Sequence, residues 1–238
     1  MKISLIICAY NEEDYIGACL DSILKNSLGK LHEIIVVDNN STDKTKSIVE
    51  KNTEVKLVFE KEQKGPNHAR QKGAEVATGD ILAFIDADTL MPPGWVDILT
   101  NEFTKNPKLA ALSGPFAYYD FPKWKQFLSS VYWYVFAFPT YLLVGYMAVA
   151  GNFAIRKNVF EKMGGYDTSI VFYGDDTNTA RRASQFGKVK FKLDFFMYSS
   201  ARRLMKQNML KVSFMYVLNF FTQAFMKKSV NNSYKEIR

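Results

Sequence analysis

The sequence predicts an α/β fold in which helices flank one mostly parallel sheet. Apolar runs at 3–9, 34–37 and 81–85 are continuous, as expected of parallel strands that are buried on both faces. Segments with helical periodicity separate these runs, and the connecting loops are short. Strands that alternate with helices in this way form parallel βαβ units.

Helix signals lie between the strands of the N-terminal half. Asn11 is a suitable N-cap, and the apolar residues after it repeat at helical spacing: Ile16, Cys19, Leu20, Ile23 and Leu24. Further elements are expected in this order: a helix opened by 41–43, a strand at 55–59, and a helix from Gly65 to about Ala77.

The C-terminal half continues the pattern until an aromatic segment interrupts it. Pro92-Pro93-Gly94 ends the strand at 81–85, and a helix follows whose apolar face holds Trp95, Val96, Leu99 and Phe103. The later elements are expected to be a strand at 109–113, a strand within 147–155, a short helix ended by Gly164-Gly165, a helix opened by Asp175-Asp176 and capped by Gly187, a strand at 189–193, and an uncharged helix at 212–226.

Composition narrows the class of protein. The 238 residues are enough for one large domain, and the two cysteines, Cys8 and Cys19, indicate a reducing compartment without a disulfide framework. The N-terminal apolar run is too short for a signal peptide. From Arg202 onward there are eight basic residues and one acid, which account for the whole net charge of +7. The tail is therefore expected to meet an anionic surface, which we take to be a membrane and not a nucleic acid.

Acidic residues follow the expected strands at the points where they end. Asp38 ends the run at 34–37, and Asp86 and Asp88 directly follow 81–85. In open α/β sheets the ligand binds beyond the carboxyl ends of the strands, and buried unpaired carboxylates are costly. Mg²⁺ is usually held by one or two carboxylates together with substrate phosphates. A metal–diphosphate site is therefore predicted, although each carboxylate alone could equally cap a turn or a helix.

The ordered set of motifs resembles family 2 of the glycosyltransferases, inverting enzymes with the GT-A fold that use sugar nucleotides. The matching segments cover about residues 3–188 in the family's order: 7–13, 36–43, 69–73, 79–80, 84–88, 164–167 and 174–176. The resemblance implies one Rossmann-like GT-A domain at 1–203, with a nucleotide-sugar half at 1–115 and an acceptor half at 116–203. The acceptor half would include an aromatic helical excursion at 120–147, and 204–238 would form a basic amphipathic helix and tail.

The resemblance also implies a role for each matching residue. Ala9, Tyr10 and Glu12 would border the nucleoside of a UDP- or GDP-sugar, and Asn11 and Ala87 would belong to the same nucleotide-sugar site. Asp38 would hydrogen-bond the base, and Arg70 would lie near the nucleotide. Asp86 would approach the ribose or the metal, Asp88 would ligate Mg²⁺ or Mn²⁺, and Asp176 would be the catalytic base. Direct displacement with one base inverts the anomeric centre. A divalent metal stabilises the charge of the leaving diphosphate, in keeping with these roles.

Some positions depart from the family pattern. Asp175 stands where glutamate is usual, so either Asp175 or Asp176 is a candidate base. The Gln-x-x-Arg-Trp signature of processive synthases is absent, and a non-processive enzyme is therefore expected. Arg202 and Arg203 lie in the comparable region, where they either bind phosphate or belong only to the basic tail. Cys8 replaces a small residue or proline, and we interpret it as a packing residue.

Two uncharged segments suggest a membrane. The 24 residues at 127–150 could span a bilayer core of about 30 Å, but one crossing would separate Asp88 from Asp176, and Pro139 is expected to interrupt the run. A buried helical excursion or a helix pair in the membrane interface remains, and the lysines that flank 212–226 favour the interface. The alternative is that both segments pack on each other as core. We expect a peripheral protein on the cytoplasmic face of the cell membrane, with a lipid-linked or other envelope glycan acceptor.

Two other classes of function compete with this one. A nucleotidyltransferase would share the sheet and the acidic site, but it would normally carry a glycine-rich basic loop where this chain has Tyr10-Asn11-Glu12-Glu13. A non-catalytic membrane-associated protein with a transferase-like fold would not need the intact set Asp38, Asp86, Asp88 and Asp176. A glycosyltransferase remains the favoured interpretation.

Overall fold

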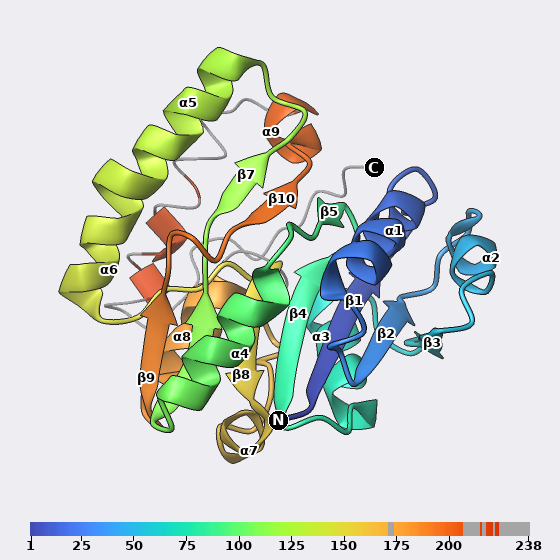
Figure 1. The fold of residues 1–238 in the computed structure, drawn as a ribbon, viewed down its shortest axis with the longest axis horizontal. Coiled ribbons are helices and arrows are strands. Elements are labelled where there is room, and N and C mark those ends of the chain that lie inside the picture. Colours follow the sequence, from blue (N-terminus) through green and yellow to red (C-terminus); the bar gives the residue numbers. More distant parts are fainter. Residues whose placement is uncertain (171–173, 207–214, 216–217, 221, 224–238) are drawn as a thin grey trace.

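A computed structural model describes residues 1–170, 174–206, 215, 218–220 and 222–223. These residues form a central seven-stranded sheet with helices on both faces and a smaller three-stranded sheet beside it (Figure 1). Of the helix expected at 212–226, only residues 215, 218–220 and 222–223 are described. Most of the basic tail, 207–238, likewise lies outside the described residues.

The central sheet is mostly parallel, as predicted. Its strand order is β3-β2-β1-β4-β8-β6-β9. β8 is antiparallel to both of its neighbours, β4 and β6, and the other pairs are parallel. The strands are β1 (Ile3–Ala9), β2 (Glu33–Asp38), β3 (Val55–Phe59), β4 (Ile81–Asp86), β6 (Leu109–Ser113), β8 (Asn152–Arg156) and β9 (Lys188–Phe191).

Helices cover the sheet on both sides, which explains why its strands are continuous apolar runs. On one face, Leu5 and Ile7 of β1 pack with α1 (Ile16–Ser27) and α4 (Trp95–Lys105). On the other face, Ile6 belongs to the cluster that includes residues of α3 (Pro66–Val76), α7 (Lys157–Lys162) and α8 (Asp175–Ala183). A short helix, α2 (Thr45–Val49), follows β2.

A second sheet brings the later part of the chain to the end of β4. It has the order β5 (Thr89–Leu90), β10 (Met197–Ser199), β7 (Phe116–Tyr118). Strands of two or three residues are too short to show periodicity, so the sequence did not predict this sheet. Directly after β10, the Ser200 amide donates to the carbonyl oxygen of Asp88 at 3.1 Å. This contact places the following helix, α9 (Arg202–Lys206), beside the Asp86-x-Asp88 motif.

The aromatic excursion is one continuous helix at 123–144, made of α5 (Lys123–Val131), a π-helical segment (Tyr132–Ala137) and α6 (Phe138–Val144). The prediction that Pro139 interrupts it is wrong. Proline lacks the amide hydrogen of an ordinary helical residue, and the wide π turn precedes it: the Phe138 amide donates to the Trp133 carbonyl five residues back. The helix therefore passes through Pro139 without a break.

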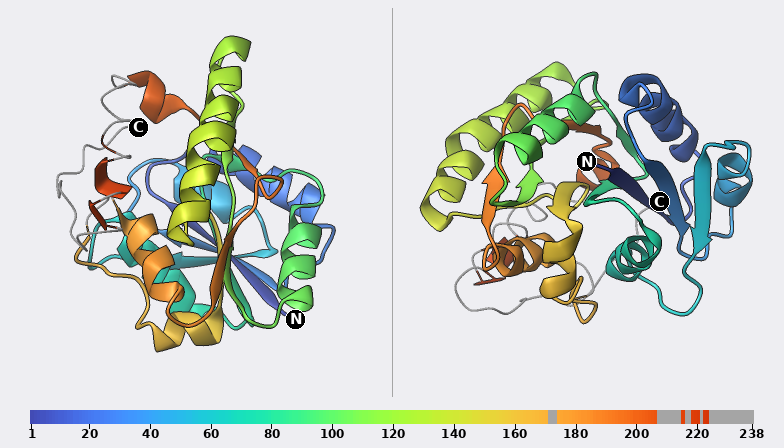
Figure 2. Two further views of the ribbon diagram at one scale, coloured as in Figure 1. Left: turned by 90° about the vertical axis from the view of Figure 1, so that its left-hand side faces the viewer. Right: turned by 60° about the horizontal axis from the view of Figure 1, so that its bottom comes forward.

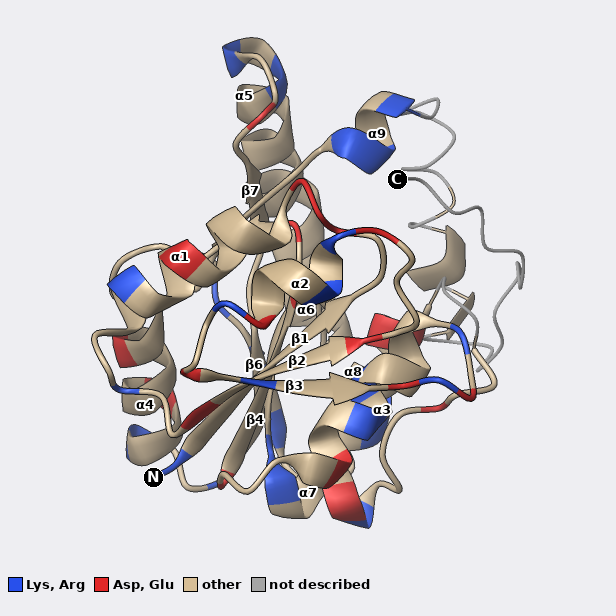
Figure 3. Cartoon of the chain, turned by 90° about the vertical axis from the view of Figure 1, so that its right-hand side faces the viewer, with Lys and Arg blue, Asp and Glu red and all other residues tan. Residues whose placement is uncertain are grey.

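This helix lies along one side of the domain, and the end formed by α5 projects beyond it (Figure 2). Its surface is mostly exposed, so it is not a buried excursion, and residues 123–144 are one helix and not two. Within the described part of the chain it is the one helix that is long and apolar enough to cross a membrane. Figure 3 shows it almost free of charged residues, except near the start of α5.

Two predicted helix caps are wrong. Asn11 does not cap α1, which begins after Tyr15. Asn11 has a φ of 52°, and its Oδ1 accepts from the Thr42 amide at 2.8 Å. Gly187 does not cap α8, which ends at Ala183. A Cβ at Gly187 would lie 2.6 Å from the Lys108 carbonyl oxygen, so glycine permits a close backbone approach there.

Candidate active site

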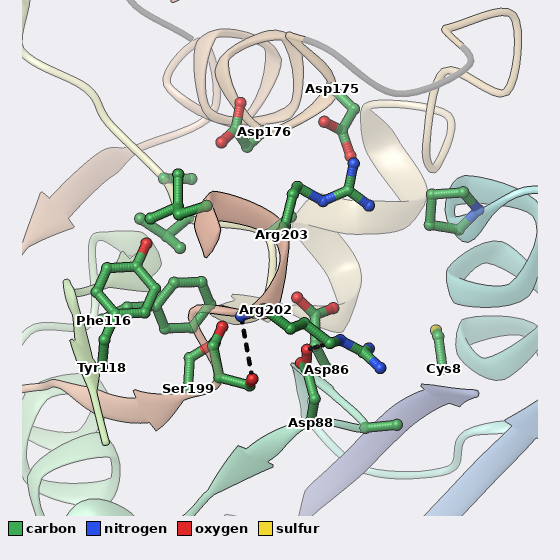
Figure 4. A pocket seen from close by; sticks show the side chains of 18 of the residues that line it. Cys8, Asp86, Asp88, Phe116, Tyr118, Asp175, Asp176, Ser199, Arg202 and Arg203 are labelled. Atoms are coloured by element: carbon green, nitrogen blue, oxygen red, sulfur yellow. Dashed lines mark hydrogen bonds and ion pairs between the residues drawn. The ribbon is translucent and has the colours of Figure 1, made fainter. Parts of the chain in front are cut away.

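A cavity of about 1080 Å³ opens at the carboxyl ends of β1 and β4. Figure 4 shows Asp86 and Asp88 on one side of it and Asp175 and Asp176 on the other. The predicted site residues that line this cavity are Ala9, Tyr10, Glu12, Arg70, Asp86, Ala87, Asp88, Asp175, Asp176, Arg202 and Arg203. The fold thus gathers into one place most of the residues that the sequence motifs marked separately.

Arg70, on α3, connects the two sides of the cavity. Its Nη2 donates to Asp86 Oδ1 and its Nη1 donates to Asp175 Oδ2, each at 3.0 Å. The side chain is 6% exposed. Burial opposes its positive charge, but Asp86 and Asp175 outweigh burial and raise the pKa of Arg70 above its ordinary value. Arg70 is therefore a fixed cation shared by two carboxylates that are far apart in sequence.

Arg202, at the start of α9, makes the second cluster. Its Nε lies 2.9 Å from Asp88 Oδ2, and its Nη2 donates to Glu12 Oε1 at 2.6 Å. The guanidinium also lies over the Tyr15 ring, 4.5 Å from its centroid. Burial opposes the charge of this arginine, but Glu12 and Asp88 raise its pKa. The basic residue is thus built into the cavity and is not only part of the tail.

Asp175 and Asp176 form the first turn of α8. Gly174, with a φ of +88°, precedes them and turns the chain into the helix. The pKa of Asp176 is raised to about 7. Burial is the largest cause and the neighbouring charge of Asp175 adds to it, whereas the Thr177 amide, which donates to Asp176 Oδ1 at 2.7 Å, opposes it. Burial also raises the pKa of Asp175, against the effect of Arg70.

Asp88 has a raised pKa, as Asp176 does, but the charged groups around the two carboxylates differ. The pKa of Asp88 is raised to about 7. Burial is the largest cause, the charge of Arg202 opposes it, and the charges of Asp86 and Glu12 add to it. In the part of the chain that is described, Asp88 forms a salt bridge with Arg202, whereas Asp176 forms none. The two groups are therefore electrostatically different despite similar pKa values.

The carboxylates around Asp88 suit a divalent cation. Asp88 and Asp86 offer hard oxygen ligands, and their mutual repulsion, with that of Glu12, raises the pKa of Asp88. A cation relieves this repulsion. Among the described residues no three His, Cys, Asp or Glu side chains converge on one point, but a cation that is also held by substrate phosphates needs only one or two carboxylates.

Two predicted residues lie outside the cavity lining. Asp38 is 2% exposed at the end of β2, and its Oδ1 accepts from the Ser41 amide at 2.9 Å. The Asn11 amide donates to Ser41 Oγ at 2.9 Å. Both residues hold together the loops after β1 and β2, and these loops carry Tyr10 and Asn39 at the cavity wall.

The motif analysis missed several residues of the site. Gly151, just before β8, lines the cavity, and a Cβ there would lie 2.2 Å from Asp86 Oδ2. Asn39, Lys64, Tyr118 and Tyr132 also line it. The absence of a side chain at Gly151 has no sequence signal beyond a lone glycine between Ala150 and Asn152. Cys8 lines the cavity too, but burial raises its pKa to about 12, which keeps the thiol protonated.

Comparison with known proteins assigns the chain to a family. Residues 4–164 match the model of glycosyl transferase family 2, and the chain belongs to this family. A glucosyl-dolichyl phosphate glucuronosyltransferase from Haloferax volcanii is 30% identical over 196 residues, which are 77% of this chain and 61% of that protein. The chain thus spans less than two thirds of the curated relatives it matches first.

Solved structures support the same fold. A mannosyltransferase from Pyrobaculum calidifontis in complex with GDP-Man and Mn²⁺ superposes with a TM-score of 0.70 at 23% identity, covering 95% of this chain and 63% of that one. Glucosyl-3-phosphoglycerate synthase from Mycobacterium tuberculosis, in complex with Mn²⁺, UDP-glucose and phosphoglyceric acid, gives a TM-score of 0.62 at 20% identity, covering 94% and 79%. The predicted GT-A fold is confirmed.

Proposed function

We propose that the protein is an inverting, non-processive glycosyltransferase that transfers a sugar from a UDP- or GDP-sugar to an acceptor hydroxyl or phosphate. The observation that carries this proposal is the position of Asp88 and Asp176 on opposite sides of one cavity. One side then serves the leaving diphosphate, and the other serves the attacking oxygen. The names of two structural neighbours, which contain GDP-Man or UDP-glucose, support the class of donor.

The donor half of the cavity would hold the nucleotide. Ala9 ends β1, Tyr10 follows it, and both line the cavity, where Lys64 lies over the Tyr10 ring at 5.7 Å from its centroid. Asp38 and Asn11 would act here by fixing the loops that meet the nucleoside. Asp88, with Asp86 beside it, would hold Mg²⁺ or Mn²⁺. When bound, the cation supplies Lewis-acid stabilisation of the departing diphosphate.

Arg202, Arg203 and Arg70 would supply positive charge to the diphosphate and to the carboxylates of the site. Arg202 already contacts Asp88 and is placed to donate to phosphate oxygens, as Arg203 beside it would be. Arg70 keeps Asp86 and Asp175 in fixed positions by donating to both. Through these contacts the chain positions the donor relative to the base.

Asp176 would be the general base. A carboxylate with a pKa near 7 accepts a proton well at neutral pH, and the value for Asp176 is about 7. Asp175 is engaged by Arg70 and is the less suitable proton acceptor. Removal of the acceptor proton as the oxygen attacks the anomeric carbon gives direct displacement and inversion.

The acceptor is proposed to be lipid-linked, or otherwise an envelope glycan, at the cytoplasmic face of the cell membrane. The exposed surface of the 123–144 helix is rich in large apolar residues: Trp124, Phe127, Tyr134, Val135, Leu142 and Leu143. Helices with aromatic residues on one side and basic residues nearby lie in the membrane interface. A relative named for a glucosyl-dolichyl phosphate substrate supports such an acceptor.

Thermal unfolding with nucleoside diphosphates tests the donor site. UDP or GDP with Mn²⁺, at about 100 times its dissociation constant, should raise the melting temperature by about 5–10 °C, and EDTA should remove the shift. Hydrolysis of a panel of sugar nucleotides would then identify the sugar. Absence of stabilisation by any nucleoside diphosphate would contradict the proposal and favour a non-catalytic protein.

Vesicle flotation tests the membrane contact. The protein should float with vesicles that contain anionic lipid and should remain at the bottom with neutral vesicles at high salt. A protein that stays wholly soluble in both cases would contradict the membrane contact without affecting the donor site.

A further inference from the structure

Arg202 is held both at its side chain and at its backbone. Its guanidinium contacts Asp88 and Glu12, as described above, and in Figure 4 it extends toward Asp86 and Asp88. The contacts at its backbone come from a distant part of the chain. An arginine side chain loses much conformational freedom when it is fixed, so its guanidinium is placed accurately only where the backbone that carries it is fixed as well.

One carboxylate fixes the backbone turn between β10 and α9. Asp120 Oδ2 accepts from the Ser200 hydroxyl at 2.6 Å, and Asp120 Oδ1 accepts from the Ala201 amide at 2.7 Å. The Ser200 oxygen in turn accepts from the Arg202 amide at 3.2 Å. Hydrogen bonds to an ionised acceptor are shorter and stronger than neutral ones. Asp120 thus holds the two residues directly before Arg202 and, through Ser200, the amide of Arg202 itself.

Asp120 makes these contacts from behind the cavity. Ser199, Ser200 and Arg202 line the cavity, whereas Asp120 is not a lining residue in the part of the chain that is described. A ligand in the cavity would therefore meet Arg202 and not Asp120. The contact with Ser200 joins residues 80 positions apart, so it is not a local turn motif.

The loop that carries Asp120 is itself anchored on both sides. The Tyr119 amide donates to the Ser199 carbonyl oxygen at 3.2 Å. Phe121 is 6% exposed, and its carbonyl oxygen accepts from the Gln126 side chain of α5 at 2.9 Å. A fixed backbone thus presents the carboxylate, as a group that positions another side chain requires.

We propose that Asp120 is a positioning residue for Arg202: it holds the start of α9 so that the Arg202 guanidinium reaches the diphosphate of the donor. This inference rests on the proposed function, because it names what places an arginine that is proposed to bind the donor. Asp120 does not touch the donor and acts only through Arg202. Without its two hydrogen bonds, the guanidinium would be displaced from the position in which it meets the diphosphate.

The sign of the effect distinguishes positioning from simple electrostatics. Asp120 is a negative charge behind a site for an anion. If it acted on the diphosphate only through its charge, its removal would relieve repulsion and tighten nucleotide binding. If it positions Arg202, its removal weakens nucleotide binding.

Isothermal titration of UDP and GDP with Mn²⁺ into the full chain tests the proposal by a double-mutant cycle. Asp120→Ala should weaken nucleotide binding by about tenfold, because a hydrogen-bonded ion pair between arginine and phosphate is lost or lengthened. In the Arg202→Gln background the same substitution should change the dissociation constant by less than about twofold, since the residue through which Asp120 acts has been removed.

Glu33→Ala is the matched control for stability. Glu33 Oε1 also accepts from hydroxyls and an amide: those of Ser4 and Thr78. Glu33 begins β2, however, and so lies at the end of the sheet opposite the cavity. Glu33→Ala should lower the melting temperature, as Asp120→Ala does, but it should leave nucleotide binding unchanged.

Two further variants grade the loss of the contacts. Asp120→Asn can still accept from the Ala201 amide and should retain nucleotide binding within about threefold of the wild type. Asp120→Ser offers one shorter acceptor, and its affinity should fall between those of Asp120→Asn and Asp120→Ala. This order tests the proposal even if Asp120→Ala does not fold.

Three outcomes would overturn the inference: equal losses of affinity from Asp120→Ala in both backgrounds, an equal loss from Glu33→Ala, or unchanged or tighter binding in Asp120→Ala. The wild type separates the two levels. If it binds a nucleoside diphosphate with Mn²⁺ while the cycle shows no coupling, Asp120 is not a positioning residue and the proposed donor site stands. If the wild type binds none, the proposed function fails together with this inference.

Discussion

The two aspartate pairs of the cavity have similar chemistry but different surroundings. In each pair, the first carboxylate, Asp86 or Asp175, is held by Arg70. In each pair, the pKa of the second carboxylate, Asp88 or Asp176, is raised to about 7, and burial is the largest cause. The difference is that Asp88 has Arg202 at 2.9 Å.

This difference indicates how one cavity separates two tasks. A carboxylate that is already balanced by a cation, and that lies beside two other carboxylates, is suited to bind a metal and a diphosphate. A buried carboxylate without a salt bridge in the described residues is suited to take a proton. Arg70 contacts the first carboxylate of each pair and so connects the two sides of the cavity.

The largest expected effect is on Asp176. Asp176→Asn should lower kcat by about 10²–10⁴-fold while nucleotide binding is retained, because the amide cannot accept the proton. Asp175→Asn is the neighbouring control and should keep measurable turnover, since Asp175 is engaged by Arg70. Initial-rate kinetics on both variants checks this. If Asp175→Asn abolishes turnover while Asp176→Asn does not, the two roles are reversed.

The second prediction breaks the link between the pairs. Arg70→Met should destabilise the protein by about 3–5 kcal/mol, because it leaves Asp86 and Asp175 without their shared cation. Urea unfolding measures the change. Lys30→Met is the control: the Lys30–Asp97 pair is 45% and 52% exposed, so its loss should cost less than about 1 kcal/mol. If both substitutions lower the free energy of unfolding equally, the contacts of Arg70 with Asp86 and Asp175 stabilise the protein no more than an exposed ion pair does.

The third prediction displaces one carboxylate without changing its charge. Gly151→Ala places a Cβ 2.2 Å from Asp86 Oδ2, so the carboxylate must shift, and kcat/KM should fall by up to about 10²-fold. Gly17→Ala is the control, because a Cβ at that position meets only Ile48 at 3.7 Å. Native kinetics for Gly151→Ala would mean that the position of Asp86 is not critical.

The fourth prediction uses the pH dependence of the kinetics to distinguish Asp88 from Asp176. Both must be ionised, so kcat/KM should fall as pH drops below about 7, with a slope steeper than tenfold per unit. At saturating donor and metal, Asp88 is already occupied. Then kcat should depend on Asp176 alone and fall at most tenfold per unit. Identical slopes for kcat and kcat/KM would argue against this division.

The sequence predicted the parts of the site that rest on local pattern. β4 and its terminal aspartates follow from a continuous apolar run, and the pair at α8 follows from a glycine and two acids at a helix start. The salt bridge from Arg70 to Asp175 could not be predicted in this way, because it joins residues 105 positions apart. Asn11 was misassigned for a similar reason: a tertiary contact with Thr42 replaces local capping.

The 123–144 helix shows a further limit of sequence reasoning. Its apolar composition and approximate range were predicted, and its exposure fits only one of the alternatives that the sequence left open. Its passage through Pro139 was not predicted. A π turn is a local adjustment of backbone hydrogen bonds, which residue periodicity does not reveal. The cavity wall beside this helix depends on where β7 places Phe116 and Tyr118, and that strand is too short for its pattern to be recognised.

Isothermal titration of UDP and GDP with Mn²⁺ into the wild type, Asp88→Asn and Asp176→Asn tests the division of roles most directly. Asp88→Asn should lose the metal-dependent part of nucleotide binding, because it loses a charged ligand of the cation. Asp176→Asn should bind the nucleotide as the wild type does, because it acts on the acceptor. Retained metal-dependent binding in Asp88→Asn, or its loss in Asp176→Asn, would contradict the division of roles.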